Sequence, residues 1–276
     1  MSSEMFGSDA FSPREIAAKV ETIGVGKARL PLLTMWMLAM LAGAFIGLGA
    51  LYFTLVRSDP TLGFATAQVL GGVVFSLGLL LVVVAGAELF TGNNLLAMAW
   101  ADGRITTREV LRNWTVVCAG NLVGAVGLAV LVFLSGHAQM NGNRVAETTM
   151  AIATAKVELP FWSAFFRGML CNVLVCMAVW MAIAGRSVVD KAVAIVFPIS
   201  AFVAAGFEHS IANMYFIPLA MMLQASGSVA ETWSAITFGG FVGNLVPVIL
   251  GNLVGGSVLV GLVYWVIYVR GQKVGG

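Results

Sequence analysis

Charged residues are scarce in this chain of 276 residues, of which only 10% are Asp, Glu, Lys or Arg while 59% are apolar. Ordinary soluble domains contain about 25% charged residues, so the composition excludes a typical soluble enzyme and favours a protein embedded in lipid. The net charge is only +2. Because the basic residues are also scattered, the sequence gives no sign of nucleic-acid binding.

Cysteine and histidine are scarce as well. The three cysteines lie in apolar runs without the spacing of a disulfide framework or a zinc site, and we expect them to be packing residues: Cys118, Cys171 and Cys176. Of the two histidines, His137 lies in a polar stretch and His209 follows Glu208 directly. Adjacent residues do not share one face of a helix, so we predict neither a metal site nor a cofactor.

Long apolar runs are plentiful, and about 20 apolar residues suffice to cross the hydrocarbon core of a bilayer. Six crossings are predicted, the second and fifth of them interrupted: 31–56, 66–87 with 95–100, 114–134, 161–184, 192–206 with 210–223, and 242–269. The predicted domains are an amphipathic N-terminal segment (1–30), a transmembrane pore domain (31–270) and a short tail (271–276). The fold class is therefore an all-α integral membrane protein.

Six crossings place both termini on the same side of the membrane. Most Lys and Arg residues outside the apolar runs fall on that side, and the positive-inside rule makes that side cytoplasmic. We therefore predict a multi-pass protein of a bacterial-type inner (plasma) membrane, with both termini and the tail in the cytoplasm.

Two interruptions of the apolar sequence match each other. GAELFTGN at 86–93 and GFEHSIAN at 206–213 both read Gly, any residue, Glu, four residues, Asn, and GNLVG occurs at 120–124 and again at 251–255. The chain thus contains two repeats, at about 31–135 and 160–270. Because each repeat has three crossings, the second is inverted, and the two breaks face each other near the bilayer midplane. This pattern is typical of a transporter or a channel.

Each break leaves backbone groups without helical partners, which is tolerated only inside protein or beside a polar cavity. We expect the carboxylates of Glu88 and Glu208 to accept hydrogen bonds from the freed N–H groups, where a helix dipole also favours negative charge. The amides near the breaks are expected to stabilise them too: Asn93, Asn213, Asn121 and Asn252.

His209 lies inside the second break. An ionisable residue within a membrane segment indicates function, and histidine exchanges a proton near neutral pH. Two interpretations stay open here: His209 handles protons or substrate, or it is a neutral imidazole that is hydrogen-bonded within the fold.

The motifs AELFTGN, GNLVG, RGMLCNVLVCMAVWMA, GRSVVDKA and GFEHSIANM, and the closing GN with LVYWVIY, occur in order between about residues 31 and 268. In them the chain resembles the formate/nitrite transporter family. The resemblance implies an aquaporin-like fold of six helices and a symmetric homopentamer with one pore in each protomer. It also implies passage of small monovalent anions of weak acids, such as formate, nitrite or hydrosulfide.

The resemblance also implies roles for single residues. His209 is the central polar group of the pore, Thr91 lies opposite it, and Asn172 is a third polar group. Lys156, taken as a loop residue, attracts the anion from outside. The remaining assignments are to constrictions, with Phe75 and Phe202 on the outer side and with Leu79, Phe90 and Val175 on the inner side, and to a gate that includes Leu89.

Physical chemistry suggests a mechanism for such a pore, because burying an unpaired carboxylate costs far more than burying the neutral acid. We expect formate, or nitrite or hydrosulfide as alternatives, to be dehydrated and protonated on the way, with the proton supplied by His209 or a pore water. A passive anion channel gated by residues 89–94 remains an alternative. Two other classes are less favoured: an aquaporin-type channel, whose Asn-Pro-Ala pairs are missing from both breaks, and an intramembrane enzyme or metal-binding subunit using Glu88, Glu208 and His209.

Overall fold

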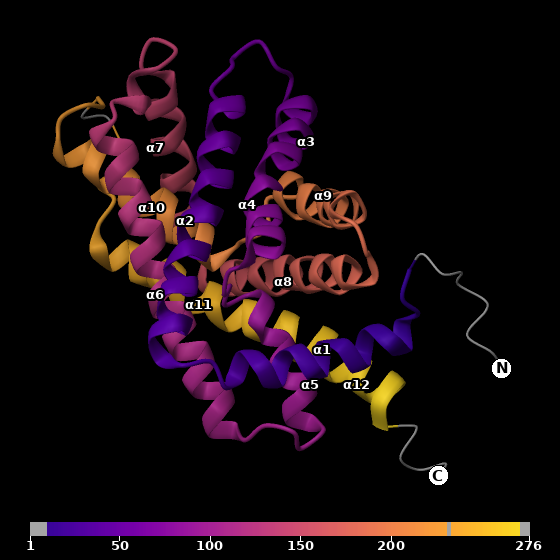
Figure 1. The fold of residues 1–276 in the computed structure, drawn as a ribbon. Helices are drawn as coiled ribbons and strands as arrows, with labels where there is room; N and C mark the ends of the chain where they lie inside the picture. The colour runs from indigo at the N-terminus through magenta and orange to yellow at the C-terminus, as the bar shows by residue number, and fades with distance from the viewer. Residues whose placement is uncertain (1–9, 231–232, 271–276) are drawn as a thin grey trace.

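The computed structural model describes residues 10–230 and 233–270, and within these ranges all regular structure is helical. The predicted tail at 271–276 and the first nine residues of the predicted N-terminal segment lie outside the described residues. The helices run at several angles to one another, with α1 (Pro13–Ala28) crossing the lower end of Figure 1 and α7 (Arg144–Val157) at the upper end.

The first half of the chain folds from α1 into a long helix, a broken helix and a second long helix. These elements are α2 (Leu32–Arg57), α3 (Phe64–Phe75), α4 (Leu77–Leu80), η2 (Leu81–Gly86), η3 (Gly92–Leu95), α5 (Leu96–Ala101) and α6 (Thr107–Leu134). The first predicted break corresponds to residues 87–91, which lie between η2 and η3.

The second half repeats this order. After the short turn η4 (His137–Gln139) come α7, α8 (Phe161–Ala184), α9 (Val188–Ala204), α10 (Ser210–Ala225) and α11 (Phe238–Leu253), which continues through η5 (Val254–Leu262), α12 (Val263–Trp265) and η6 (Val266–Arg270). The second predicted break, residues 205–209, separates α9 from α10.

Capping residues fix where several helices begin. Ser12, Thr106 and Ser187 each accept a hydrogen bond from the backbone N–H three residues later, and the acidic side chain at that position bonds back. Such capping boxes satisfy N–H groups that the first helical turn leaves free. At α1, the bonds that Ser12 donates to the exposed Glu15 carboxylate lower its pKa.

Among the described residues, five helical segments are long and apolar enough to cross a membrane: 32–57, 64–86, 107–134, 161–184 and 238–270. The fifth predicted crossing consists of α9 and α10, each shorter than 18 residues because the break divides them. The structure thus confirms an all-helical membrane protein with interrupted second and fifth crossings.

The duplicated GNLVG motifs bring helices into close contact in both halves. A Cβ atom on Gly124 of α6 would lie 1.8 Å from the carbonyl oxygen of Met40 in α2. A Cβ on Gly255, at the same place in the second motif, would lie 2.1 Å from the carbonyl oxygen of Met169 in α8. Only glycine permits backbones to approach this closely.

Two local predictions need correction. Lys156, taken as a loop residue, belongs to the amphipathic helix α7 (144–157), which buries one side through Val145, Ala146, Met150 and Ala153. The last long helix begins at Phe238, ahead of the predicted start at Val242, because Thr237 caps it through a bond from the Gly240 N–H.

Candidate functional site

A clamp of four side chains holds the first break. Lys27, near the end of α1, places its Nζ atom 2.6 Å from Glu88 Oε1 and 3.1 Å from Asn93 Oδ1. Asn93 Nδ2 donates to Glu88 Oε2 at 2.7 Å and to Asn113 Oδ1 at 2.9 Å. Asn113 Nδ2 closes the ring by donating to the Lys27 carbonyl oxygen at 3.1 Å.

The second break has a matching clamp, except that among the described residues Asn213 Oδ1 has no hydrogen bond, whereas Asn93 Oδ1 accepts one from Lys27. Lys156, near the end of α7, bonds both carboxylate oxygens of Glu208 at 2.9 and 3.1 Å. Asn213 Nδ2 donates to Glu208 Oε2 and to Asn244 Oδ1, both at 2.7 Å, and Asn244 Nδ2 donates to the Lys156 carbonyl oxygen at 2.8 Å. Lys156 therefore lies in a helix and in an ion pair, which corrects its description as a loop residue.

Asn121 and Asn252 complete the duplication. Asn121 Oδ1 accepts from the Phe90 N–H, and its Nδ2 donates to the carbonyl oxygens of Ala39 and Glu88. Asn252 Oδ1 accepts from the Ser210 N–H, and its Nδ2 donates to the carbonyl oxygens of Gly168 and Glu208. These two fully buried amides thus tie backbone groups of each break to a neighbouring helix.

The expected partners of the glutamates were wrong. The freed N–H groups beside the breaks bond to Asn121, Asn252 and His209, whereas the Glu88 and Glu208 carboxylates accept from lysine and asparagine side chains. A buried carboxylate needs a charge partner more than a buried N–H does. Lys27 and Lys156, which are distant from Glu88 and Glu208 in sequence, supply that charge.

His209 and Thr91 connect the two breaks. Thr91 Oγ1 lies 3.1 Å from His209 Nε2, and both residues are buried. His209 also caps α10, because its Nδ1 accepts from the Ala212 N–H at 3.2 Å. An accepting Nδ1 assigns the proton of the neutral ring to Nε2. The Nε2–H group therefore donates to Thr91, whose hydroxyl proton remains available for another acceptor.

Two phenylalanines stand beside His209. The Phe202 ring stacks on the imidazole with centroids 5.8 Å apart, and the Phe75 ring meets Phe202 edge to face at 5.7 Å. Both phenylalanines are buried. An apolar layer thus covers the side of the imidazole toward α3 and α9.

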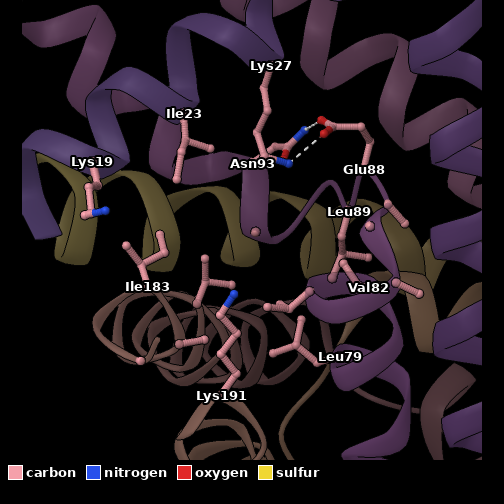
Figure 2. A pocket seen from close by; sticks show the side chains of 18 of the residues that line it. Lys19, Ile23, Lys27, Leu79, Val82, Glu88, Leu89, Asn93, Ile183 and Lys191 are labelled. Carbon is pink, nitrogen blue, oxygen red and sulfur yellow. Dashed lines mark hydrogen bonds and ion pairs between the residues drawn. The ribbon is translucent and has the colours of Figure 1, made fainter. Parts of the chain in front are cut away.

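A cavity of about 1140 Å³ opens at the first break, and we name it the Glu88 cavity (Figure 2). Leu79, Val82 and Leu89 form part of its apolar wall. Its charged lining residues are Lys19, Lys27, Glu88, Arg186 and Lys191. The cavity therefore carries a positive excess.

A second cavity of about 460 Å³, the Glu208 cavity, lies at the second break. Phe75, Phe202 and His209 line its inner end. Its charged lining residues are Arg57, Lys156, Arg167 and Glu208. The two cavities have no lining residue in common, and Thr91, which is fully buried, lines neither.

Besides Thr91, three predicted pore residues line neither cavity. The Asn172 amide donates to the carbonyl oxygens of Thr91 and Asn252 and to Asn94 Oδ1. Its own Oδ1 is buried without a hydrogen bond among the described residues. Phe90 and Val175 are buried in the apolar core. The structure therefore places Asn172 behind the first break, where it binds the backbone.

Lys27, Asn113 and Asn244 were missed as members of the clamps, although the sequence contains a signal for each. KARLP at 27–31 matches KVELP at 156–160, and Asn113 and Asn244 each precede the GN of GNLVG by the same number of residues. These matches between the two halves of the sequence are too short to be significant alone. They gain meaning only when the structure aligns the halves.

The geometry defines a class of protein. Two separate cavities with positive excess approach one buried Thr–His contact from opposite breaks of an inverted helical repeat, and in the described part of the chain no group of three or more metal-ligating side chains occurs. This is the architecture of a membrane transport protein.

Comparisons with known proteins agree with that class. Residues 14–266 match the family model described as formate/nitrite transporter. The formate channel FocA of Escherichia coli K12 is 42% identical over 95% of this chain and 96% of its own length. A probable formate transporter of Methanothermobacter thermautotrophicus is 40% identical over 96% of this chain and 99% of its own. The chain belongs to the formate/nitrite transporter family, and it is a transport protein rather than an enzyme.

Solved structures show the same fold. A pentameric formate channel with formate bound superimposes with a TM-score of 0.80 at 39% identity, covering 86% of this chain and 97% of that one. An ion channel of the same family gives a TM-score of 0.81 at 33% identity, covering 92% and 98%.

Proposed function

We propose that this protein conducts small monovalent anions of weak acids across a bacterial inner membrane, with formate as the main substrate. The observation that carries the proposal is the buried contact between Thr91 and His209, 3.1 Å apart between two cavities with positive excess. The relatives named formate channels, and the solved relative with formate bound, support formate as the choice of anion.

The barrier between the cavities is apolar on both sides of this contact. We assign Phe75 and Phe202 to the constriction at the Glu208 cavity, and Leu79 and Leu89 to the constriction at the Glu88 cavity, because these side chains line the corresponding ends. Dehydration there penalises an anion and raises its pKa, so a weak acid gains a proton more readily than in water.

His209 contributes a hydrogen bond to this step. Its Nδ1 accepts a hydrogen bond from the Ala212 N–H. A protonated imidazolium would carry an N–H at Nδ1 as well, and that N–H would face the Ala212 N–H, which is itself a donor. We therefore propose that neutral His209 donates from Nε2 to the anion, in exchange for Thr91, while a pore water supplies the proton. The positive excess of the two cavities favours entry of the anion.

Assembly and orientation follow the same reasoning. We propose a homopentamer with one pore in each protomer, in line with the pentameric relative. We also propose that the Glu88 cavity, beside α1, faces the cytoplasm together with both termini, and that the Glu208 cavity faces outside. Native mass spectrometry in detergent gives the subunit number, and labelling of single introduced cysteines in intact cells gives the orientation.

The test of function is uptake of labelled formate into proteoliposomes containing the purified protein. We expect saturable uptake that increases with an inward proton gradient, and competition by nitrite and hydrosulfide ranks the alternative substrates. Absence of uptake above protein-free liposomes would overturn the proposal. Osmotic swelling assays with glycerol distinguish an aquaporin-type channel.

One observation favours regulation at the first break. Lys27 belongs to α1 and bonds both Glu88 and Asn93, so a displacement of α1 moves the segment that carries Leu89, Phe90 and Thr91. We propose that residues 89–94 act as a gate coupled to α1. A deletion of residues 1–20 that leaves flux unchanged at every pH would contradict this coupling.

A further inference from the structure

Each cavity contains one lysine whose charge is already compensated. Lys27 Nζ lies 2.6 Å from Glu88, and Lys156 Nζ lies 2.9 Å from Glu208. The Lys156 side chain is only 13% exposed. At the distance of an incoming anion, a close ion pair acts as a weak dipole because the two opposite fields nearly cancel. The lysines therefore contribute little net attraction while the clamps are intact.

Arg57, the last residue of α2, is held differently. Its guanidinium donates to Gln68 Oε1, and Gln68 Nε2 donates to the Ala204 carbonyl oxygen at 3.2 Å. The Phe53 ring lies 6.0 Å from the Arg57 guanidinium carbon. Both of these contacts of Arg57, with Gln68 and Phe53, are with neutral groups, and within residues 10–230 and 233–270 no carboxylate forms an ion pair with Arg57. The charge is thus fixed in place and uncompensated.

Arg57 and its holder Gln68 both line the Glu208 cavity, together with Phe53. Arg167 lines the same cavity but is exposed, and its backbone carbonyl is the group that contacts the break by accepting from the Glu208 N–H. A guanidinium presents paired N–H groups that match the two oxygens of a carboxylate, whereas an ammonium group acts as a point charge.

We propose that Arg57 is the anion-capture residue of the Glu208 cavity, and that Lys156 acts as a positioning residue of the second break. This inference rests on the proposed transport function. It also specifies a ligand class, because a fixed guanidinium favours planar anions with two adjacent oxygens, such as formate and nitrite, over hydrosulfide.

The inverted repeat places an arginine at the matching position of the other cavity. Arg57 follows the capping Pro31 by 26 residues, and Arg186 follows the capping Pro160 by the same 26. Arg186 lines the Glu88 cavity, with its guanidinium carbon 4.3 Å from the Phe11 ring. Its charge also contributes, after the Ser12 bonds, to lowering the pKa of Glu15. The charge of Arg186 is therefore partly compensated by a nearby carboxylate, unlike that of Arg57.

The experiment compares formate uptake by Arg57→Gln and Arg144→Gln in proteoliposomes at low ionic strength. Arg144 is exposed at the start of α7 and lines neither cavity, so this control removes the same charge from the side of the protein that we propose to face outside. We expect Arg57→Gln to raise the apparent KM for formate about three- to tenfold with little change in Vmax. At high salt we expect the difference in KM between the two variants to shrink, because added salt shortens the Debye length and screens the charge of Arg57.

Substrate comparison makes the test sharper. Arg57→Lys keeps the charge but loses the paired donors, so we expect it to restore the KM for hydrosulfide more fully than the KM for formate or nitrite. Lys156→Gln, in contrast, is expected to lower Vmax and the amount of folded protein. Equal KM values for Arg57→Gln and Arg144→Gln would overturn the inference while leaving transport established, whereas a wild-type protein that takes up no formate overturns the proposed function itself.

Discussion

Thr91 Oγ1 and His209 Nε2 belong to different breaks and to residues that are 118 positions apart in sequence, yet the two atoms lie 3.1 Å from each other. Neither residue has a counterpart at the equivalent position of the other break, where the chain has His209 against Leu89 and Ile211 against Thr91. The surrounding Lys, Glu and Asn residues, in contrast, are duplicated. The repeat therefore builds a symmetric frame, and the contact that we assign to substrate is the part that departs from symmetry.

The hydroxyl of Thr91 is predicted to be needed for transport. Thr91→Val keeps the shape of the side chain and leaves the His209 Nε2–H group without an acceptor, which costs about 1–3 kcal/mol for a buried donor. We expect lower formate flux in proteoliposomes, with Thr91→Ser close to wild type. A fully active Thr91→Val protein would remove Thr91 from the site.

The two clamps are predicted to differ in strength. Loss of one partner of a buried ion pair destabilises by about 3–5 kcal/mol, and partial exposure of the lysine reduces this figure. The Lys156 side chain is 13% exposed and that of Lys27 is 29% exposed. We therefore expect Lys156→Met to lower the thermal unfolding temperature in detergent more than Lys27→Met.

A double variant provides the control for this prediction. Glu208→Gln in the Lys156→Met background removes the uncompensated charge, so part of the lost stability should return. If the double variant is as unstable as the sum of the two single changes, the destabilisation does not arise from the unpaired carboxylate.

Asn121 and Asn252 are predicted to contribute equally to the stability of the protein. Asn121→Ala and Asn252→Ala each leave one backbone N–H and one carbonyl group of the break without their partner, and each also removes a bond to a carbonyl of a neighbouring helix. We expect losses of several kcal/mol in both, since each unsatisfied buried group costs about 1–3 kcal/mol. Gln139→Ala, at an exposed turn, serves as the control in the same unfolding measurement.

Close packing of α2 against α6 gives a prediction that does not involve polar groups. Gly124→Ala places a methyl group 1.8 Å from the Met40 carbonyl oxygen, whereas Gly127→Ala, on the same helix, meets no atom within 4 Å. Overpacking typically costs about 1–3 kcal/mol, and here backbone must move. Gly124→Ala should lower expression and thermal stability, and Gly127→Ala should not. Equal stability of the two variants would refute the close approach.

Much of the fold was predictable because apolar length and a visible repeat determine it. The charge-free runs located the crossings, and the two Gly–Glu–Asn motifs located both breaks. Helix α7 was not predicted because it is short and amphipathic. A short segment with apolar residues on one side can be either a helix or a surface loop that packs against the protein. The start of the sixth crossing was predicted too late, because the polar cap residue Thr237 that begins the helix does not stand out in a search for apolar runs.

The site was predictable only in part. His209 was identified as an ionisable residue inside the second break, Thr91 was identified through the resemblance to the family, and the structure brings them together. Neither composition nor periodicity relates Lys27 to Glu88 or Lys156 to Glu208, because these pairs join separate elements in three dimensions. Asn172 was placed in the pore by resemblance, yet its amide binds the backbone of the first break. Which polar group faces a cavity depends on rotamers that sequence does not specify.

The most direct test of the central claim is labelled formate uptake into proteoliposomes across a pH series, comparing wild type with His209→Phe. The account predicts that wild-type uptake rises as the outside is acidified, because protonation in the barrier becomes more favourable, and that His209→Phe takes up far less formate at every pH. Folded His209→Phe protein with wild-type uptake and unchanged pH dependence would contradict the account.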